Sequence, residues 1–330
     1  MNWGDIVTNA LREAVGPQAA WFCLMAIGLN VHYGYTGLLN FGQIVFAMIG
    51  AYGLAISVAT FGLPLWVGVL GGVAASLVLA LILGLPTLRL RGDYFAIVTI
   101  AAAEIVRLVI ASNSTTDVTG GPFGLSGLAG AFHDLNPFPD RRLTIIGNWS
   151  YVDSQVWSGL VTWLVVALAT VYVHLLMRSP WGRVIKGIRE DEDAVRSLGK
   201  NAFGYKMQSL MIGGAIGALG GMMASIQSSS VTPLNFRPQQ TFFAYAILVL
   251  GGAATTFGPI VGTMIFWFLV QGLTSLLGQL ADQGLIPEVI ATQDRIGALV
   301  LAVVGLALVV QMVLRPQGIF GSRRELILDV

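Results

Sequence analysis

The sequence predicts an all-α integral membrane protein, a polytopic helical bundle of roughly 8 to 10 spans that includes broken or re-entrant segments. Hydrophobic residues make up 55% of the chain, charged residues make up 11%, and the mean hydropathy is +0.76. Soluble domains usually contain about 25% charged residues. Residues 14–88 contain no Asp, Glu, Lys or Arg in 75 positions, enough for about three spans of roughly 20 residues each. The 41 glycines suit helices that pack closely or break inside a membrane.

Apolar runs place the helices in order along a single transmembrane domain that covers residues 1–330. We expect helices near 18–36, 38–60, 64–86, 93–112, 156–177, 206–228, 241–275 and 296–314. The run 241–275 must break, because its centre reads LGGAATTFGP and glycine and proline interrupt a helix. Such a break is tolerated in lipid only where the backbone lines an enclosed or watery cavity.

The distribution of basic residues predicts the orientation of these spans. Of the 18 Lys and Arg residues, two lie in 88–92, seven in 178–206 and three after residue 314. Basic residues near span ends favour the cytoplasmic side, so these segments and the C-terminus are predicted to be cytoplasmic. Residues 112–155 are then an extracytoplasmic loop. The chain must also be outside both before and after the run 241–275, which therefore crosses twice or dips and returns.

Residues 178–206 form a dense charged segment between two uncharged spans, with 11 of the 35 formal charges of the chain. Ser179 followed by Pro180 is a typical helix start, and Gly199 is a plausible helix end. Apolar residues recur between them at helical spacing: Val184, Ile185, Ile188, Val195 and Leu198. We expect one amphipathic helix over 180–199 at the membrane surface, with its apolar stripe available to a partner.

Two segments in different halves of the chain are similar to each other. FGQIVFAMI at 41–49 and FGPIVGTMI at 257–265 share six of nine residues, although two apolar nonamers can also agree by chance. Broken segments in corresponding halves indicate a solute path built from an internal repeat, which we expect to be inverted. Polar residues at these breaks either contact a solute or join neighbouring helices. They are Asn30, Asn40, Gln43, Thr255 and Thr256.

Catalytic motifs are absent from the sequence. The histidines are scattered, and His32 is expected to be a satisfied interior group rather than a proton switch. The Gly199-Lys200 dipeptide lacks the remaining residues of a phosphate-binding loop, so we expect no nucleotide site and no cofactor in this chain. Cys23 is the only cysteine, which excludes an intrachain disulfide and a cysteine-cluster metal site. A net charge of +1 gives no indication of a nucleic-acid partner.

Glu104 and Arg107 are ionisable residues three positions apart in the predicted helix 93–112. Charged side chains at membrane depth are costly, so they mark either a functional site or a structural ion pair. If the protein were a secondary transporter driven by an ion gradient, Glu104 would be the coupling carboxylate. A membrane enzyme acting on lipid is a further alternative, but clustered His, Asp or Glu residues at a membrane face are lacking.

The charged segment resembles a known family. SPWGRVIKGIREDEDAVRSLGKNAFGYK is similar to the cytoplasmic loop of permease subunits of branched-chain amino acid ABC importers, especially the LivM-type subunit. Further agreement is found in GLNVHYGYTGLLNFGQIVFAMIGAY at 28–52, LRLRGDYFAIVTIAAAEIVR at 88–107 and TGGPFGLSG at 119–127. The resemblance runs from about residue 20 to 320 in order.

This resemblance implies a permease subunit in a prokaryotic plasma membrane. Its implied partners are a LivH-type second permease, two ATPase subunits that hold ATP and Mg²⁺, and an extracytoplasmic solute-binding protein. The loop positions implied to couple to the ATPases are Gly182, Arg183, Ile188, Arg189, Glu190, Asp191, Glu192, Ala194 and Gly199. Asn40 and Gln43 stand where the family commonly has Ser and His, so urea, short amides and other amino acids remain alternative solutes. Glu104 completes the set of candidate pathway residues.

Overall fold

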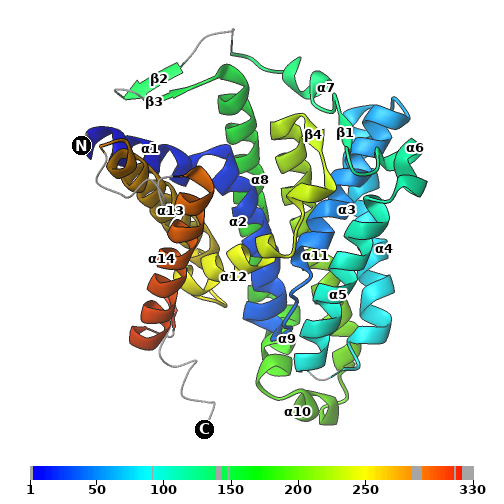
Figure 1. Ribbon diagram of the computed structural model, residues 1–330. Helices are drawn as coiled ribbons and strands as arrows, with labels where there is room; N and C mark the ends of the chain where they lie inside the picture. The colour runs from blue at the N-terminus through cyan, green and yellow to red at the C-terminus, as the bar shows by residue number, and fades with distance from the viewer. Residues whose placement is uncertain are drawn as a thin grey trace.

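Helices dominate the computed structural model, which describes residues 3–90, 92–138, 143–146, 149–283, 292–315 and 317–321 (Figure 1). Within these ranges six helices are long and apolar enough to cross a membrane, or up to eight if each of two bent helix pairs is one span. The predicted polytopic all-helical membrane fold is confirmed. The bent pairs join residues 3–15 to 17–35, at 45°, and residues 92–110 to 113–119, at 61°.

The first half of the chain forms the helices that the apolar runs predict, plus an amphipathic helix before them. Its elements are α1 (Trp3–Val15), α2 (Pro17–Leu29), the π-helix η1 (Asn30–Tyr35), α3 (Gln43–Ala55), the π-helix η2 (Ile56–Thr60), α4 (Leu65–Thr87) and α5 (Gly92–Ile110). The chain from residue 37 to residue 42 is not helical, so the first predicted break is present there.

The predicted extracytoplasmic loop contains only short elements. They are η3 (Asn113–Thr115), α6 (Thr116–Thr119), β1 (Leu125–Ser126), α7 (Gly130–His133), β2 (Leu143–Ile146) and β3 (Trp149–Tyr151). β2 pairs with β3, and β1 pairs with β4 (Ser230–Val231), both antiparallel. The pairing of β1 with β4 fixes this loop to the chain that follows residue 228.

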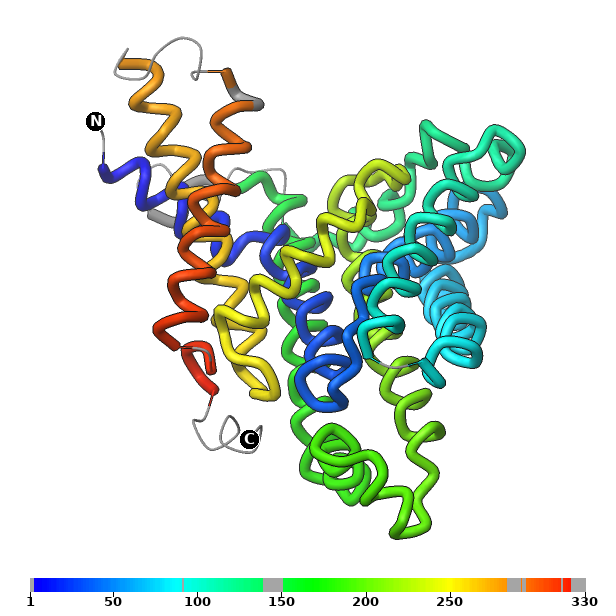
Figure 2. The backbone as a smooth tube through the Cα atoms, turned by 60° about the horizontal axis from the view of Figure 1, so that its bottom comes forward, coloured from blue at the N-terminus to red at the C-terminus, as the bar shows by residue number. Residues whose placement is uncertain are grey.

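The second half contains two long spans, a pair of short helices between them, and a broken hairpin. Its elements are α8 (Asp153–Arg178), α9 (Pro180–Glu190), α10 (Glu192–Ser197), α11 (Ala202–Ser228), η4 (Pro233–Asn235), α12 (Gln239–Gly251), α13 (Gly258–Asp282) and α14 (Gln293–Leu314). α9 and α10 lie at one end of the molecule, which we call the α9–α10 end. The opposite end, with α6, α7, β2 and β3, is the loop end (Figures 1 and 2).

Glycine allows the central helices to approach closely. α11 packs against α2, α3 and α4. A Cβ atom added at Gly221 of α11 would lie 1.9 Å from the carbonyl oxygen of Ala47 in α3, and one at Gly50 would lie 2.6 Å from the Cβ of Ala218. Without a hydrophobic driving force between helices in lipid, such close backbone packing holds the bundle together. Several other glycines of α3, α4 and α11 lie in equally close contacts.

The run 241–275 is a hairpin that dips and returns. α12 has 13 residues, so it is about 20 Å long, shorter than a hydrocarbon core of about 30 Å. Residues 252–257 form the break, where Gly252 has φ +106° and Ala254 has φ +60°. α13, with 25 residues, then returns towards the loop end (Figure 1). The dip-and-return alternative therefore satisfies the orientation requirement.

The two similar segments both begin helices that follow a break. Gly42 immediately precedes α3, and Gly258 is the first residue of α13. Both helices rise from their breaks towards the loop end (Figure 1). The inverted orientation that we predicted is therefore wrong for these two segments, because sequence similarity alone does not carry the direction of a helix across the membrane.

Candidate functional site

Asn30, the first residue of η1, joins this π-helix to the second break. Its Nδ2 donates to the carbonyl oxygen of Thr255 at 2.8 Å, and its Oδ1 accepts from the backbone N–H of Ala254 at 2.9 Å. The side chain is 2% exposed. These bonds satisfy backbone groups that the break leaves without helical partners. The Thr255 hydroxyl donates to the Gly252 carbonyl oxygen and accepts from the N–H of Gly258, which caps the start of α13.

Asn40 and Gln43 belong to a buried polar cluster around His32. Asn40 Nδ2 lies 3.1 Å from His32 Nδ1 and 3.3 Å from Gln43 Oε1. His32 Nε2 lies 3.1 Å from the Leu210 carbonyl oxygen, and Gln43 Nε2 donates to the Gly213 carbonyl oxygen. All three side chains are fully buried. In this conformation they join η1, the first break and α11, and His32 is the satisfied interior group that we expected.

The remaining pathway candidates lie apart from this cluster. Thr256 Oγ1 is 3.1 Å from His174 Nδ1, which connects the second break to α8. Glu104 binds Arg107 through two contacts, Nε to Oε2 at 2.9 Å and Nη2 to Oε1 at 2.5 Å. Both carboxylate oxygens of Glu104 are thus engaged within one turn of α5. This geometry is that of the structural ion pair named as the alternative.

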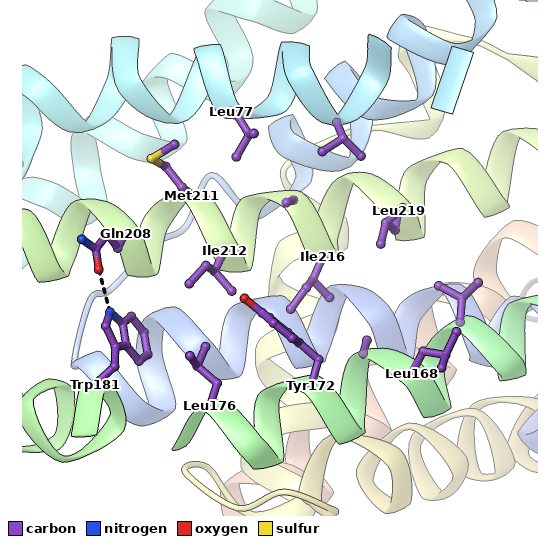
Figure 3. Close-up of a pocket in the computed structure, with 14 residues that line it drawn as sticks. Leu77, Leu168, Tyr172, Leu176, Trp181, Gln208, Met211, Ile212, Ile216 and Leu219 are labelled. Atoms are coloured by element: carbon purple, nitrogen blue, oxygen red, sulfur yellow. Dashed lines mark hydrogen bonds between the residues drawn. The ribbon is translucent and has the colours of Figure 1, made fainter. Parts of the chain in front are cut away.

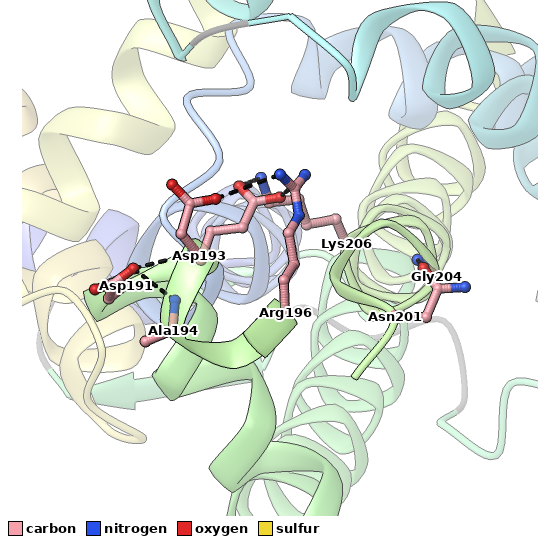
Figure 4. Close-up of polar contacts among 8 residues, drawn as sticks. Asp191, Asp193, Ala194, Arg196, Asn201, Gly204 and Lys206 are labelled. Atoms are coloured by element: carbon pink, nitrogen blue, oxygen red, sulfur yellow. Dashed lines mark hydrogen bonds and ion pairs between the residues drawn. The ribbon is translucent and has the colours of Figure 1, made fainter. Parts of the chain in front are cut away.

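The predicted single helix over 180–199 is wrong, because Asp191 divides it. The Asp191 backbone is extended, and its Oδ1 accepts from the N–H groups of Asp193 and Ala194 at 2.9 Å each (Figure 4). An aspartate in this role ends α9 and caps α10. Ser179 caps α9 as predicted, and Gly199, at φ +72°, follows the end of α10 in the left-handed conformation.

Most of the apolar stripe of this segment is covered by the protein itself. Ile185 is fully buried, and Ile188 and Val195 are 4% and 9% exposed. Ile188 and Val195 pack with Ala202 at the start of α11. Leu198, which also belongs to the predicted stripe, is 78% exposed. The prediction that the whole stripe is available to a partner is therefore wrong for Ile185, Ile188 and Val195, and Leu198 is left accessible. Gly182 also faces inward, because an added Cβ would lie 2.5 Å from the Met177 carbonyl oxygen.

The opposite face of the helix pair is exposed and charged. Six of the residues implied to couple to the ATPases are exposed to solvent: Arg183, Arg189, Glu190, Asp191, Ala194 and Gly199. Glu192 is half-buried because it binds Arg196 at 2.6 Å and also Lys206 (Figure 4). The implied coupling set therefore separates into inward residues that fix the helix pair and residues that are exposed to solvent.

Arg189 connects the helix pair to the first break. Its Nη1 donates to the Gly34 carbonyl oxygen in η1 at 2.6 Å. The Lys186 ammonium lies 5.9 Å from the centroid of the Tyr35 ring, within the range of a cation–π contact. A cation at the end of η1 also satisfies a helix C-terminus. Sequence reasoning had no signal for the Gly34 contact, since its acceptor is a backbone atom.

A groove between α4, α8 and α11 has about 900 Å³ of space and an apolar wall (Figure 3). Leu77, Leu168, Ile212 and Leu219 are among its lining residues. At its end nearest α9, Trp181 Nε1 donates to Gln208 Oε1 at 2.7 Å, so these polar atoms are already paired. The described wall of the groove is almost entirely apolar, so it offers few partners for the charged groups of an amino acid.

α14 and the chain after it cover the second break, which the sequence did not predict. Gln311 Nε2 donates to the Leu250 carbonyl oxygen at 3.2 Å, and Phe320 N–H donates to the Gly251 carbonyl oxygen at 3.1 Å. These donors satisfy carbonyl groups at the end of α12. The polar Gln311 in the otherwise apolar helix 296–314 was the available signal.

Comparison with known proteins decides the family. The sequence pattern of the family described as branched-chain amino acid transport system / permease component matches residues 14–312. The chain belongs to this family. It is a permease component, and its fold has the membrane-spanning helices that this description requires.

Several relatives are similar over most of their length. The high-affinity branched-chain amino acid transport system permease protein LivM of Salmonella typhimurium is 32% identical, over 81% of this chain and 68% of the relative. LivM of Escherichia coli has the same identity and coverage. The guanosine ABC transporter permease protein NupQ of Bacillus subtilis is 26% identical, over 83% of this chain and 84% of the relative.

Proposed function

We propose that this chain is the LivM-type permease subunit of an ATP-driven importer for branched-chain or related amino acids. It would work in a prokaryotic plasma membrane with a LivH-type permease, two ATPase subunits and an extracytoplasmic binding protein. The α9–α10 end and the C-terminus would be cytoplasmic. The 32% identity to two LivM proteins supports the solute class.

The observation that carries the coupling proposal is the contact of Arg189 with Gly34. The exposed face of α9 and α10 offers charges to a partner, and the inner face is bonded to η1. η1 begins at Asn30, whose side chain holds the turn at Ala254 and Thr255. A displacement of the helix pair is thus transmitted through one π-helix to both breaks. ATPase binding on the outer face would in this way open the buried polar cluster.

A charge reversal at Glu190 tests this proposal. Glu190 is the last residue of α9 and is exposed, and a basic residue there agrees with the helix dipole, so Glu190→Arg should fold. The measurement is ATP-dependent leucine uptake by the full importer in proteoliposomes. We expect at least a ten-fold loss of uptake and weaker retention of the ATPase subunits.

Asp117→Arg is the matched control, because it makes the same charge change on an exposed position of α6 at the loop end. It should keep ATPase retention unchanged. Undiminished uptake in Glu190→Arg would contradict coupling through this face. Uptake driven by an imposed proton gradient without ATP would favour a secondary transporter, and uptake of urea, acetamide or guanosine instead of leucine would refute the proposed solute.

A further inference from the structure

A polar cavity lies at the loop end, away from the two breaks. It has a volume of about 410 Å³ and is enclosed by the first turns of α2 and α8, the last turns of α11 and the start of α12. Five amide side chains and three serines contribute to its wall. The amides are Gln18, Gln155, Gln227, Asn235 and Gln240. None of the described lining residues is Asp, Glu, Lys or Arg.

This wall is chemically suited to a solute with both an ammonium and a carboxylate group. A primary amide donates through its nitrogen and accepts through its oxygen, so a set of amides can bind both charges without a fixed charge of its own. Gln240 Oε1 is buried and has no hydrogen-bond partner among the described residues. An unsatisfied buried acceptor costs about 1–3 kcal/mol, so it favours a ligand that brings a donor.

One side of the cavity is apolar. Trp21 and Phe236 are 8% and 4% exposed, and Leu234 also lines the space. An aliphatic side chain placed against these residues would leave water. Ligand sites commonly combine such a wall with a few convergent polar groups.

A second hollow shares three glutamines with this cavity and adds a pair of opposite charges. It has a volume of about 230 Å³ and is lined by Arg12 and Glu13 in addition to Gln18, Gln155 and Gln227. Arg12 Nη2 lies 3.3 Å from Glu13 Oε1, and Arg12 Nε is buried without a hydrogen-bond partner in the described part of the chain. Adjacent opposite charges orient a zwitterion, whereas they attract an uncharged amide less strongly.

α12, whose start lines the cavity, also packs near the first break. Gln240 is followed by Thr241, whose Oγ1 accepts from the Ile44 N–H at the start of α3 at 3.1 Å. On the same helix, Tyr245 contacts Phe41 with ring centroids 4.8 Å apart. Phe41 belongs to the first break, so α12 contacts both the cavity and this break. A solute in the cavity would therefore contact the same helix that packs against the first break.

We propose that this cavity is the receiving site for a zwitterionic amino acid with an aliphatic side chain. The proposal rests on the proposed transport function and adds the site at which the solute first binds this subunit. The amide groups bind the two charged groups, Gln240 Oε1 accepts from the ammonium, and Trp21 and Phe236 contact the side chain. Movement of the Phe41 and Tyr245 rings would then admit the solute to the breaks.

The first test compares Gln240→Leu with Gln239→Leu in the full importer. Gln239 is the exposed neighbour and does not line the cavity, so it is a matched control. Leucine uptake by proteoliposomes should need at least ten-fold more leucine for half-maximal rate in Gln240→Leu, and should change less than two-fold in Gln239→Leu. Thermal unfolding of Gln240→Leu should not occur at a lower temperature, because the substitution removes an unsatisfied acceptor. A less than two-fold change in uptake for Gln240→Leu would overturn the proposal.

The second test measures binding of the solute to the cavity separately from its transport. Gln227→Cys in a Cys23→Ser background should react with a membrane-impermeant maleimide, and leucine with the binding protein should slow the reaction at least five-fold. Acetamide should have no effect. Slowing by acetamide but not by leucine, or by neither, would overturn the zwitterion site. If the wild-type importer takes up no leucine but leucine protects this cysteine, the proposed function fails while the site stands.

Discussion

Removal of the Arg189 guanidinium should release the α9–α10 pair from η1. Arg189→Met keeps a long flexible stem but loses the bond to the Gly34 carbonyl oxygen, which measures 2.6 Å. Hydrogen bonds to charged groups contribute about 1.5–3 kcal/mol. Because Arg189 is exposed to solvent, screening places the contribution of this bond at the lower end of that range, about 1.5 kcal/mol.

A loss of about 1.5 kcal/mol corresponds to roughly a ten-fold increase in the undocked population, since about 1.4 kcal/mol is a factor of ten. The backbone bonds that follow η1 report on this population. Gly37 N–H donates to the Tyr33 carbonyl oxygen and Leu38 N–H donates to the His32 carbonyl oxygen. In nanodiscs, amide hydrogen exchange at Gly37 and Leu38 should become about ten-fold faster in Arg189→Met.

Arg183→Met is the control for this experiment. Arg183 lies on the same helix, and its side chain is exposed, so exchange at Gly37 and Leu38 should be unchanged. Exchange at these amides that is equal in Arg189→Met and in the wild-type chain would refute the reasoning. The first break would then be held by the buried cluster alone, and the coupling route through Arg189 would be lost.

Two further predictions concern packing and the α5 ion pair. Gly221→Ala should lower the thermal unfolding temperature by several degrees, because the added Cβ would lie 1.9 Å from the Ala47 carbonyl oxygen and overpacking costs about 1–3 kcal/mol. The control Gly278→Ala, where an added Cβ has no atom within 4 Å, should leave this temperature unchanged. Equal unfolding temperatures for the two variants would contradict the close contact at Gly221. Glu104→Gln should reduce the yield of folded protein, and Glu104→Gln with Arg107→Gln should recover part of it, because the single change leaves one charge unpaired. Uptake by the surviving Glu104→Gln importer should still require ATP, and a purely gradient-driven uptake would show that the pair is not structural.

Several local features were predictable from the sequence because their causes are local. Ser179 and Gly199 bound the charged segment through cap chemistry, which depends on neighbouring residues only. The break at 252–257 follows from glycine and proline in the same way. The division of the segment at Asp191 was also a local signal, an Asx cap preceding Asp193 and Ala194, but it was outweighed by the helical spacing of the apolar residues.

The contacts of the candidate site were not predictable in this way. Asn30 and Thr255 are 225 positions apart, and Arg189 and Gly34 are 155 apart. Two of the acceptors are backbone carbonyl groups, which every residue carries, so residue type gives no signal of the pairing. The inward face of α9 shows the same limit: an amphipathic pattern predicts that a face will be covered, but it does not tell whether the same chain or a partner covers it.

The sequence by itself determined the membrane-spanning class, the place of the helix breaks and the family, because each depends on hydropathy, on local backbone chemistry or on a contiguous motif. Only the tertiary structure decided that the two similar segments point the same way, that Asn40 and Gln43 are buried around His32, and that five amides from three distant parts of the chain share one cavity. The physical reason is that a polar side chain at membrane depth must find a partner, and the three-dimensional packing of the helices decides which partner is within reach.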